Sequence, residues 1–358
     1  MNLRTFITIS LILVFSFSFG QTKKLKIYTD ERIELLNVIQ YLSDYPILNQ
    51  SENLEYKKEI DLYFKDFKNH NAIVLNRKVY REFLGFDRAV NYILHYDLPK
   101  FDLNSEFDSK ELKNLNALDS KDSINLIRNE FKDFYEKSNF KHFFENHSKF
   151  YKKINKSTKK ELNKYNIISI LESHYGIKNN SYSIILAALL HNGGYEVDIE
   201  NEKGNNLIAI IGPSYDSINK IPFFDTQNIL SEYVIHEFSH SFCNPLIDKY
   251  YYQLQESECL LIPIHDKIKS QGYKGWKTCL YEHLVRANEI VINEIVFGKE
   301  KSDKLYNEMI NDGWIYLEGI VPIIKDEYLK NRNKYKTQDE IMELVINYLE
   351  KEKEKCVK

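Results

Sequence analysis

The sequence is poor in cysteine and carries no strong excess of charge of either sign. Its four cysteines, Cys243, Cys259, Cys279 and Cys356, form no CxxC pair, which argues against a zinc ribbon built from thiolates. Two of the first three could pair as a disulfide in an oxidising compartment, and buried free thiols are an equal alternative. The formal net charge is -3 over 358 residues, so nothing points to a nucleic-acid partner.

Long apolar runs are confined to the N-terminus. The segment MNLRTFITISLILVFSFSFGQTKK has a short first part with Arg4, followed by an apolar run from Phe6 to Phe19 that ends among small residues at Ser18 and Gly20. This order is typical of a secretory signal peptide, residues 1–20, cut near Gly20. The run is shorter than the roughly 20 residues that span a bilayer, and an uncleaved anchor is the rival interpretation. We therefore expect a secreted or periplasmic protein whose mature chain has no membrane span.

The rest of the chain divides by pattern, without internal repeats or low-complexity segments. From residue 30 to 175 apolar residues recur at helical spacing, as in ERIELLNVIQYLSDY. After residue 178, SYSIILAALL, YEVDIE and NLIAIIGP are rich in β-branched residues and separated by glycines, which predicts two or three strands. We predict an α+β fold with a mainly helical region, 21–177, and a second region, 178–350. The second region would hold a small mixed sheet, the motif-bearing helix and C-terminal helices.

Several helices have predictable ends. The spacing of residues 123–154 predicts a long helix with a break near Ser138–Asn139. The stretch WKTCLYEHLVRANEIVINEIVFG predicts a helix that ends at Gly298. Residues 224–242 also show helical spacing, and we expect Asn244–Pro245 to close that helix because proline cannot continue it.

The most informative stretch is SEYVIHEFSHSFCNPLID, residues 231–248. Histidine is scarce, at 10 of 358 residues, yet His236 and His240 stand one helical turn apart with Glu237 between them. Side chains four residues apart project from one helix face, so both imidazoles could reach one metal ion. Glu237 could act as general base on a water that zinc activates. Two solvent-facing histidines on an ordinary helix are the alternative interpretation.

A catalytic zinc site takes three protein ligands and keeps one position open. The pattern HExxHxxGxxH is absent, because Cys243 and Leu246 stand where it needs glycine and histidine. The remaining choice is a carboxylate from a later helix, as in the thermolysin-like gluzincins.

The helix predicted before Gly298 offers that carboxylate. At about 100° per residue, Glu282, Arg286, Glu289 and Asn293 fall on one side of it. We favour Glu282 as the ligand and keep Glu289 as the alternative, while Arg286 would hold the carboxylate or the substrate. A solvated face with an ordinary Glu–Arg pair is the competing interpretation.

The motif and its flanks resemble one bacterial family. HEFSHSFCNPL, the preceding LLHNGGYEV and the following EHLVRA are similar to the domain of unknown function 4932 family, as are ERIELLNVIQYLSDY and YLKNRNKYKTQDEI. The resemblance covers most of the mature chain and implies a zincin-like fold with peptidase activity. It implies metal ligands at His236, His240 and Glu282, with Glu237 as base and Arg286 beside them.

We therefore expect a secreted zinc metallopeptidase of the gluzincin type. Zn2+ would be bound by His236, His240 and Glu282, and Glu237 and Arg286 would be the catalytic residues. The partner would be a peptide or protein substrate, bound main chain to main chain along a strand. A zincin-shaped protein that binds metal or peptide without turnover is a second hypothesis, and a helical protein without metal is a third. The donor to the oxyanion stays open among Arg286, His283 and the 26 tyrosines.

Overall fold

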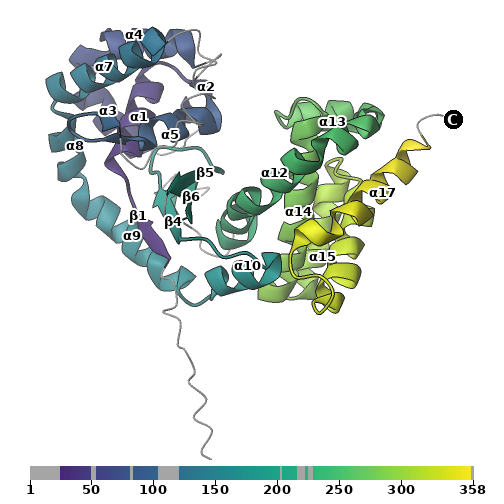
Figure 1. The fold of residues 1–358 in the computed structure, drawn as a ribbon. Coiled ribbons are helices and arrows are strands. Elements are labelled where there is room, and N and C mark those ends of the chain that lie inside the picture. The colour runs from purple at the N-terminus through teal and green to yellow at the C-terminus, as the bar shows by residue number, and fades with distance from the viewer. Residues whose placement is uncertain are drawn as a thin grey trace, which may run out of the picture.

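The protein is a mostly helical, mixed α/β fold built around a small mixed sheet (Figure 1). The computed structural model describes residues 25–49, 54–80, 84–103, 121–201, 204–215, 222–224 and 229–355. The predicted signal peptide, residues 1–20, and its cut near Gly20 lie outside these ranges. Among the described residues, no helix combines the length and the apolar character that crossing a membrane requires.

Four strands form the sheet, in the order β1-β4-β6-β5. They are β1 (Lys26–Tyr28), β4 (Ser181–Leu186), β5 (Gly194–Asn201) and β6 (Gly204–Ile211). β1 and β6 run parallel to β4, whereas β5 runs antiparallel to β6 and lies at one edge of the sheet. The prediction of two or three strands in SYSIILAALL, YEVDIE and NLIAIIGP is confirmed, because these stretches form β4, β5 and β6. β1, a strand of only three residues, was not predicted.

Different helices cover the two faces of the sheet, because successive side chains along a strand point to opposite faces. Ile184 packs in a core shared with α12 and α14, whereas Ile185 packs in a core shared with α1, α5 and α7. These helices are α1 (Glu31–Leu42), α5 (Phe86–Leu94), α7 (Lys121–Lys137), α12 (Ile235–Leu254) and α14 (Trp276–Phe297). Helices α1, α5 and α7 therefore lie on one side of the sheet and the motif helix α12 on the other (Figure 1).

The N-terminal region is mainly helical, as predicted. The break expected near Ser138–Asn139 separates α7 from α8, and Asn139 there has a left-handed backbone with φ of 51°. The other elements of this region are α2 (Pro46–Asn49), α3 (Leu54–Tyr63), η1 (Lys65–Phe67), α4 (Asn71–Val79), β2 (Tyr96–Asp97), β3 (Asp102–Leu103), α8 (Phe140–Asn146), α9 (Ser148–Leu162) and α10 (Ile167–Tyr175).

The chain after the sheet is helical, and one predicted helix end there is wrong. α14 ends at Gly298 as predicted, but α12 does not stop at Asn244–Pro245 and continues to Leu254 with Pro245 inside it. Proline removes one backbone donor, and burial of Ile247 and Leu254 beyond it stabilises the continued helix. The other elements are β7 (Ser214–Tyr215), β8 (Pro222–Phe223), η2 (Ile229–Val234), η3 (Gln255–Ile264), α13 (His265–Ser270), α15 (Lys299–Asn311), α16 (Leu317–Pro322), η4 (Ile323–Tyr328), η5 (Leu329–Asn331), η6 (Gln338–Ile341) and α17 (Met342–Lys353).

The cysteines of the described ranges are free thiols, namely Cys243, Cys259 and Cys279. Cys356 lies outside those ranges. Burial raises the pKa of both Cys243 and Cys279 to about 12. These two residues therefore serve as small buried side chains, which is the second of the two alternatives that the sequence left open.

Candidate metal centre

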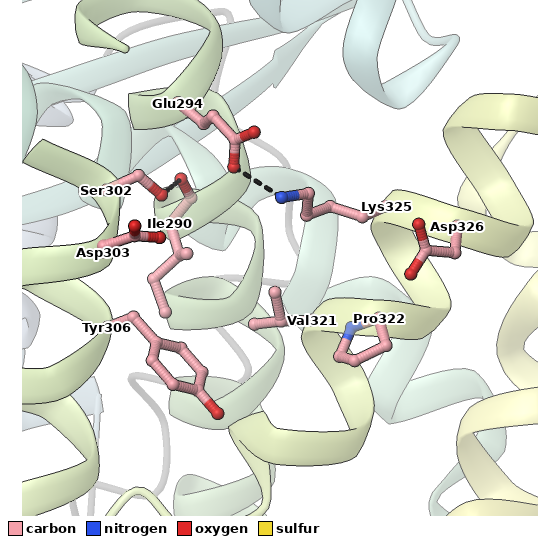
Figure 2. Close-up of a pocket in the computed structure, with 9 residues that line it drawn as sticks. All are labelled: Ile290, Glu294, Ser302, Asp303, Tyr306, Val321, Pro322, Lys325 and Asp326. Atoms are coloured by element: carbon pink, nitrogen blue, oxygen red, sulfur yellow. Dashed lines mark hydrogen bonds and ion pairs between the residues drawn. The ribbon is translucent and has the colours of Figure 1, made fainter. Parts of the chain in front are cut away.

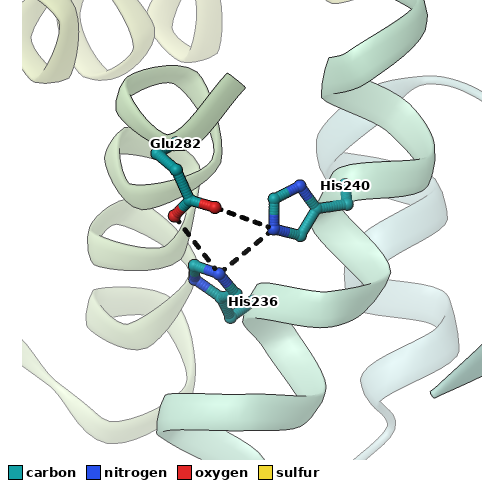
Figure 3. A group of neighbouring side chains, drawn as sticks. All are labelled: His236, His240 and Glu282. Carbon is teal, nitrogen blue, oxygen red and sulfur yellow. Dashed lines mark hydrogen bonds and ion pairs between the residues drawn. The ribbon is translucent and has the colours of Figure 1, made fainter. Parts of the chain in front are cut away.

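Two packed helices position the candidate site. α12 carries the HExxH motif, and α14 lies against it with Glu282 on the facing side (Figure 3). Glu289 is also on that side of α14, because it contacts His236. The apolar side of α12, which includes Ile235 and Phe238, is fully buried in the core. The two histidines of the motif are therefore turned away from that core and toward α14.

The imidazoles of His236 and His240 converge on the carboxylate of Glu282 (Figure 3). Their Nε2 atoms lie 3.2 Å apart. His236 Nε2 lies 3.6 Å from Glu282 Oε2, and His240 Nε2 lies 3.5 Å from Glu282 Oε1. One potential ligand atom from each residue falls within 4.8 Å of the others. The solvated-face interpretation of α14 does not hold, because the Glu282 side chain is only 6% exposed.

The Nδ1 atoms of both imidazole rings also have hydrogen-bond partners. His236 Nδ1 lies 2.9 Å from Glu289 Oε2, and His240 Nδ1 lies 3.2 Å from Asn244 Oδ1. Both partner atoms can accept a hydrogen bond, which favours imidazoles with the proton on Nδ1 and the lone pair on Nε2. Burial also lowers the pKa of His236 well below its usual value, which favours the neutral ring.

These contacts separate the roles of the two glutamates that the sequence could not distinguish. Glu282 lies on the Nε2 side of both rings, where the lone pairs meet, and Glu289 lies behind His236 at Nδ1. Metal-binding histidines commonly donate their second ring N–H to a carboxylate, which fixes the tautomer and ring orientation. The donor set of two imidazoles and one carboxylate is one that zinc accepts in catalytic sites.

A single guanidinium holds the Glu282 carboxylate. Arg286 Nη2 lies 3.1 Å from Glu282 Oε2 and donates to Tyr273 Oη over 3.1 Å. The guanidinium also stacks on Trp314, with its central carbon 4.5 Å from the ring centre. Burial alone would raise the pKa of Glu282, but Arg286 and the two imidazoles outweigh it, so the pKa is lowered and the carboxylate stays ionised.

A cavity of about 420 Å³ opens beside this group and is lined by both helices, by α15 and by the start of β5. Glu237 lines it next to Gly194, where a Cβ atom would lie 2.8 Å from Glu237 Oε1. Glycine at this position therefore lets β5 approach the carboxylate closely. Burial raises the pKa of Glu237, and the charges of Glu282 and Glu289 add to the effect. A cation in the donor set would act in the opposite direction.

Several lining residues were not assigned a role from the sequence. His191, which follows β4 and precedes the Gly193–Gly194 turn, lines the cavity, and so does Tyr273. His283, one of the candidate oxyanion donors, is instead packed beside Trp314, with Nδ1 against the Cys279 carbonyl oxygen. The glycines between the predicted strands indicated a turn beside His191, whereas Tyr273 comes from a separate loop with no local pattern to connect it to this cavity.

A second cavity, of about 270 Å³, lies between α14, α15, α16 and η4 (Figure 2). Lys325 Nζ bonds Glu294 Oε2 over 2.7 Å, and the Ser302 hydroxyl donates to the Ile290 carbonyl oxygen. Its two aspartates, Asp303 and Asp326, each form an ion pair with a lysine four residues away in the chain. The charged groups of this cavity are thus already satisfied, and no histidine or cysteine is among the residues that line it.

A second grouping of possible ligands lies in the N-terminal region, at His70, Glu130 and Asp133. His70 Nδ1 accepts the backbone N–H of Ala72 as a helix N-cap, and His70 Nε2 pairs with Asp133, which also pairs with Lys137. Helix capping and surface ion pairs explain this grouping without a metal ion.

Comparison with known proteins identifies the family of this chain. No curated protein and no solved structure matches it. Residues 25–347 match the family described as Domain of unknown function (DUF4932), a span that includes both helices of the candidate site. The chain therefore belongs to the family Domain of unknown function (DUF4932).

Proposed function

We propose that this protein is a zinc-dependent metallopeptidase of the gluzincin type. The observation that carries the proposal is the convergence of His236 Nε2, His240 Nε2 and the Glu282 carboxylate within 4.8 Å. The Nδ1 partners of both rings support it, because they orient the lone pairs toward this point. A zinc ion held by these three residues would polarise a substrate carbonyl and lower the pKa of a water to about 7.

Glu237 is the residue that would move the proton. It lines the cavity one position after His236, as general-base catalysis at an HExxH motif requires. Its carboxylate would accept a proton as the oxygen of water attacks the carbonyl carbon, and would return it to the leaving nitrogen. Arg286 would hold Glu282 ionised and in place through their ion pair.

The arrangement of the sheet supports a peptide as substrate and a zincin-like core. β5 lies at the sheet edge and begins at the cavity wall, beside Glu237. An extended peptide added along such an edge would bring a backbone carbonyl to the catalytic group through main-chain hydrogen bonds. In this proposal the enzyme acts outside the cytoplasm, because residues 1–20 have the order of a signal peptide.

The first experiment measures zinc in the mature chain, residues 21–358, after reconstitution. We expect about one zinc per chain in the wild type, as in three-ligand catalytic sites, and loss of that zinc in His240→Ala and Glu282→Gln. Glutamine replaces Glu282 because it keeps the side-chain volume beside Arg286. A wild type that takes up no zinc would refute the proposal.

Turnover is tested on a library of internally quenched peptides. Glu237→Gln should retain zinc and lose about 100- to 10,000-fold in kcat, the usual loss when a general base is removed. Asp248→Asn, on the exposed part of α12, is the matched control and should keep both zinc and activity, because its partners, Lys277 and the Tyr281 hydroxyl, lie at the surface. Zinc binding with no cleavage of any library peptide would favour the second hypothesis, a binding protein without turnover.

A further inference from the structure

The proposed reaction needs a donor for the negative charge that develops on the carbonyl oxygen. Four side chains of the cavity wall carry N–H or O–H groups suited to this, at His191, Tyr233, Tyr273 and Arg286. The Tyr233 hydroxyl already donates its hydrogen bond to Asn192 Oδ1 over 3.0 Å. His191 lies in the loop before β5 and lines the cavity, and no described contact joins it to the three proposed ligands. Arg286 is already bound to Glu282.

The Tyr273 hydroxyl is connected to the proposed ligand Glu282 through one shared nitrogen of Arg286. One nitrogen, Arg286 Nη2, contacts both Tyr273 Oη and Glu282 Oε2, each over 3.1 Å. The hydroxyl is thus no more than two hydrogen-bond lengths from an oxygen of the ligand set. Because its oxygen accepts a hydrogen bond from a cation, its own O–H becomes a stronger donor.

The surroundings of Tyr273 hold the ring in a defined position. The ring meets Trp314 edge-on, at 5.4 Å between centres and 77° between planes. Trp314 is buried, and the Arg286 guanidinium also stacks on it. One indole ring therefore positions both Tyr273 and Arg286. Tyr273 stands in the loop between α13 and α14, where Gly272 and Gly275 have φ of 96° and 85°. Those left-handed conformations favour glycine and let the chain turn the tyrosine inward.

We propose that Tyr273 donates its hydroxyl hydrogen bond to the carbonyl oxygen as that oxygen becomes negative, with Arg286 polarising the phenol. The inference rests on the proposed peptidase function. The oxygen of water bonds to the carbonyl carbon, the π pair moves onto the carbonyl oxygen, and the proton of water goes to Glu237. Tyr273 shares its proton without losing it. When the C–N bond breaks, the pair returns to C=O and Glu237 protonates the leaving nitrogen.

A purely positioning role is the rival explanation, because the Tyr273 hydroxyl also interacts with the Glu282 carboxylate. The two roles differ in what Tyr273→Phe would change. A positioning residue would affect zinc affinity, whereas an oxyanion donor would affect kcat and the binding of a transition-state mimic. Phenylalanine keeps the ring on Trp314, so the variant is expected to fold.

The experiment compares wild type, Tyr273→Phe and the control Tyr281→Phe as full mature chains. Tyr281 neighbours Glu282 in sequence, but its hydroxyl bonds Asp248 at the surface. For Tyr273→Phe we expect a loss of about 100- to 1000-fold in kcat, as for removal of one oxyanion donor, with KM and zinc affinity within twofold of wild type. A phosphinic peptide that copies the best library substrate should bind more weakly by a similar factor. Tyr281→Phe should match wild type in every measurement.

The outcomes distinguish a failure of the proposed Tyr273 role from a failure of the proposed peptidase function. Full kcat in a zinc-loaded Tyr273→Phe overturns the inference alone, and so does weakened zinc affinity with normal kcat per bound zinc. A wild type that binds no zinc overturns the peptidase proposal and the role of Tyr273 with it. A parallel loss in kcat and in phosphinic-peptide affinity, at unchanged zinc affinity, supports the inference.

Discussion

The buried carboxyl group of Glu34 gives a stability prediction that is independent of any metal. Glu34 lies on α1 with no exposed surface. Its two oxygens accept hydrogen bonds from Tyr56 Oη at 2.7 Å and from the backbone N–H of Ala188 at 3.0 Å. Ala188 belongs to the loop that leads to His191 in the cavity wall. Burial raises the pKa of Glu34 from 4.5 to about 7 in spite of these bonds.

The raised pKa sets the sign of the pH dependence. Between pH 4.5 and about 7 the unfolded chain has lost this proton while the native protein keeps it. The native state then binds more protons, so its stability falls as the pH rises, by up to about 1.4 kcal/mol per pH unit. The contribution is complete below pH 4.5 and is lost above about pH 7. Over the whole window it amounts to about 3 kcal/mol.

Glu34→Gln removes this titration and keeps a side chain of the same shape that can accept one bond and donate another. The free energy of unfolding is measured by urea denaturation of both proteins from pH 5 to pH 8. Because other groups titrate alike in both, the difference between variant and wild type isolates Glu34. From pH 5 to pH 8 we expect that difference to rise by about 2.5 kcal/mol in favour of the variant, because part of the titration of the unfolded chain lies below pH 5.

The control is Glu55→Gln, which changes a carboxylate that is 83% exposed on α3. The difference in the free energy of unfolding between Glu55→Gln and wild type should not change with pH. A flat difference for Glu34→Gln as well, within about 0.5 kcal/mol, would mean that the buried carboxyl group is ionised throughout. Burial would then be too weak to keep Glu34 protonated against its two hydrogen bonds, and the expected pH dependence would be wrong.

Three further predictions concern the cavity. Glu289→Gln should weaken zinc affinity by about 10- to 100-fold without abolishing binding, because it alters the partner of His236 Nδ1 rather than a ligand; competition with a chelator measures this. Gly194→Ala should lower kcat and leave zinc content unchanged, since the new methyl group would lie 2.8 Å from Glu237 Oε1; intact activity would show that Glu237 can move aside. Zinc at 100 times its Kd should stabilise the folded protein by about 2.7 kcal/mol relative to the chelated protein, which thermal unfolding detects; an identical midpoint would contradict a native-state site.

Local sequence patterns allowed most of the fold to be predicted, but short or strongly charged elements were not predicted. β4, β5 and β6 have β-branched runs bounded by glycine, and α14 has a clear apolar side and a terminal Gly298. β1 has only three residues, too few for any periodicity to appear. α15 is rich in lysine and glutamate, so its helical spacing is weak. The error at Pro245 has a tertiary cause, because burial on both sides of the proline decides where α12 ends.

The candidate site was predictable where it depends on one helix and unpredictable where it depends on two. His236 and His240 follow from i,i+4 spacing. Glu282 and Glu289 stand seven residues apart, about two helical turns, so both face the same way. Which of them meets Nε2 depends on how far α14 is shifted along α12, and no local pattern encodes that shift. Tyr273 and Trp314 come from separate loops and carried no signal.

The charges around the cavity argue for a divalent cation more strongly than the spacing of the motif does. Glu237, Glu282 and Glu289 are all buried, and in their ionised forms they would carry three negative charges against the single positive charge of Arg286. Buried charge without compensation is costly, and the raised pKa values of Glu237 and Glu289 express that cost. A divalent cation would bring the group to neutrality. A helical protein with no metal would gain nothing from three carboxylates at this position, because well-packed apolar residues of similar volume would serve its stability as well or better.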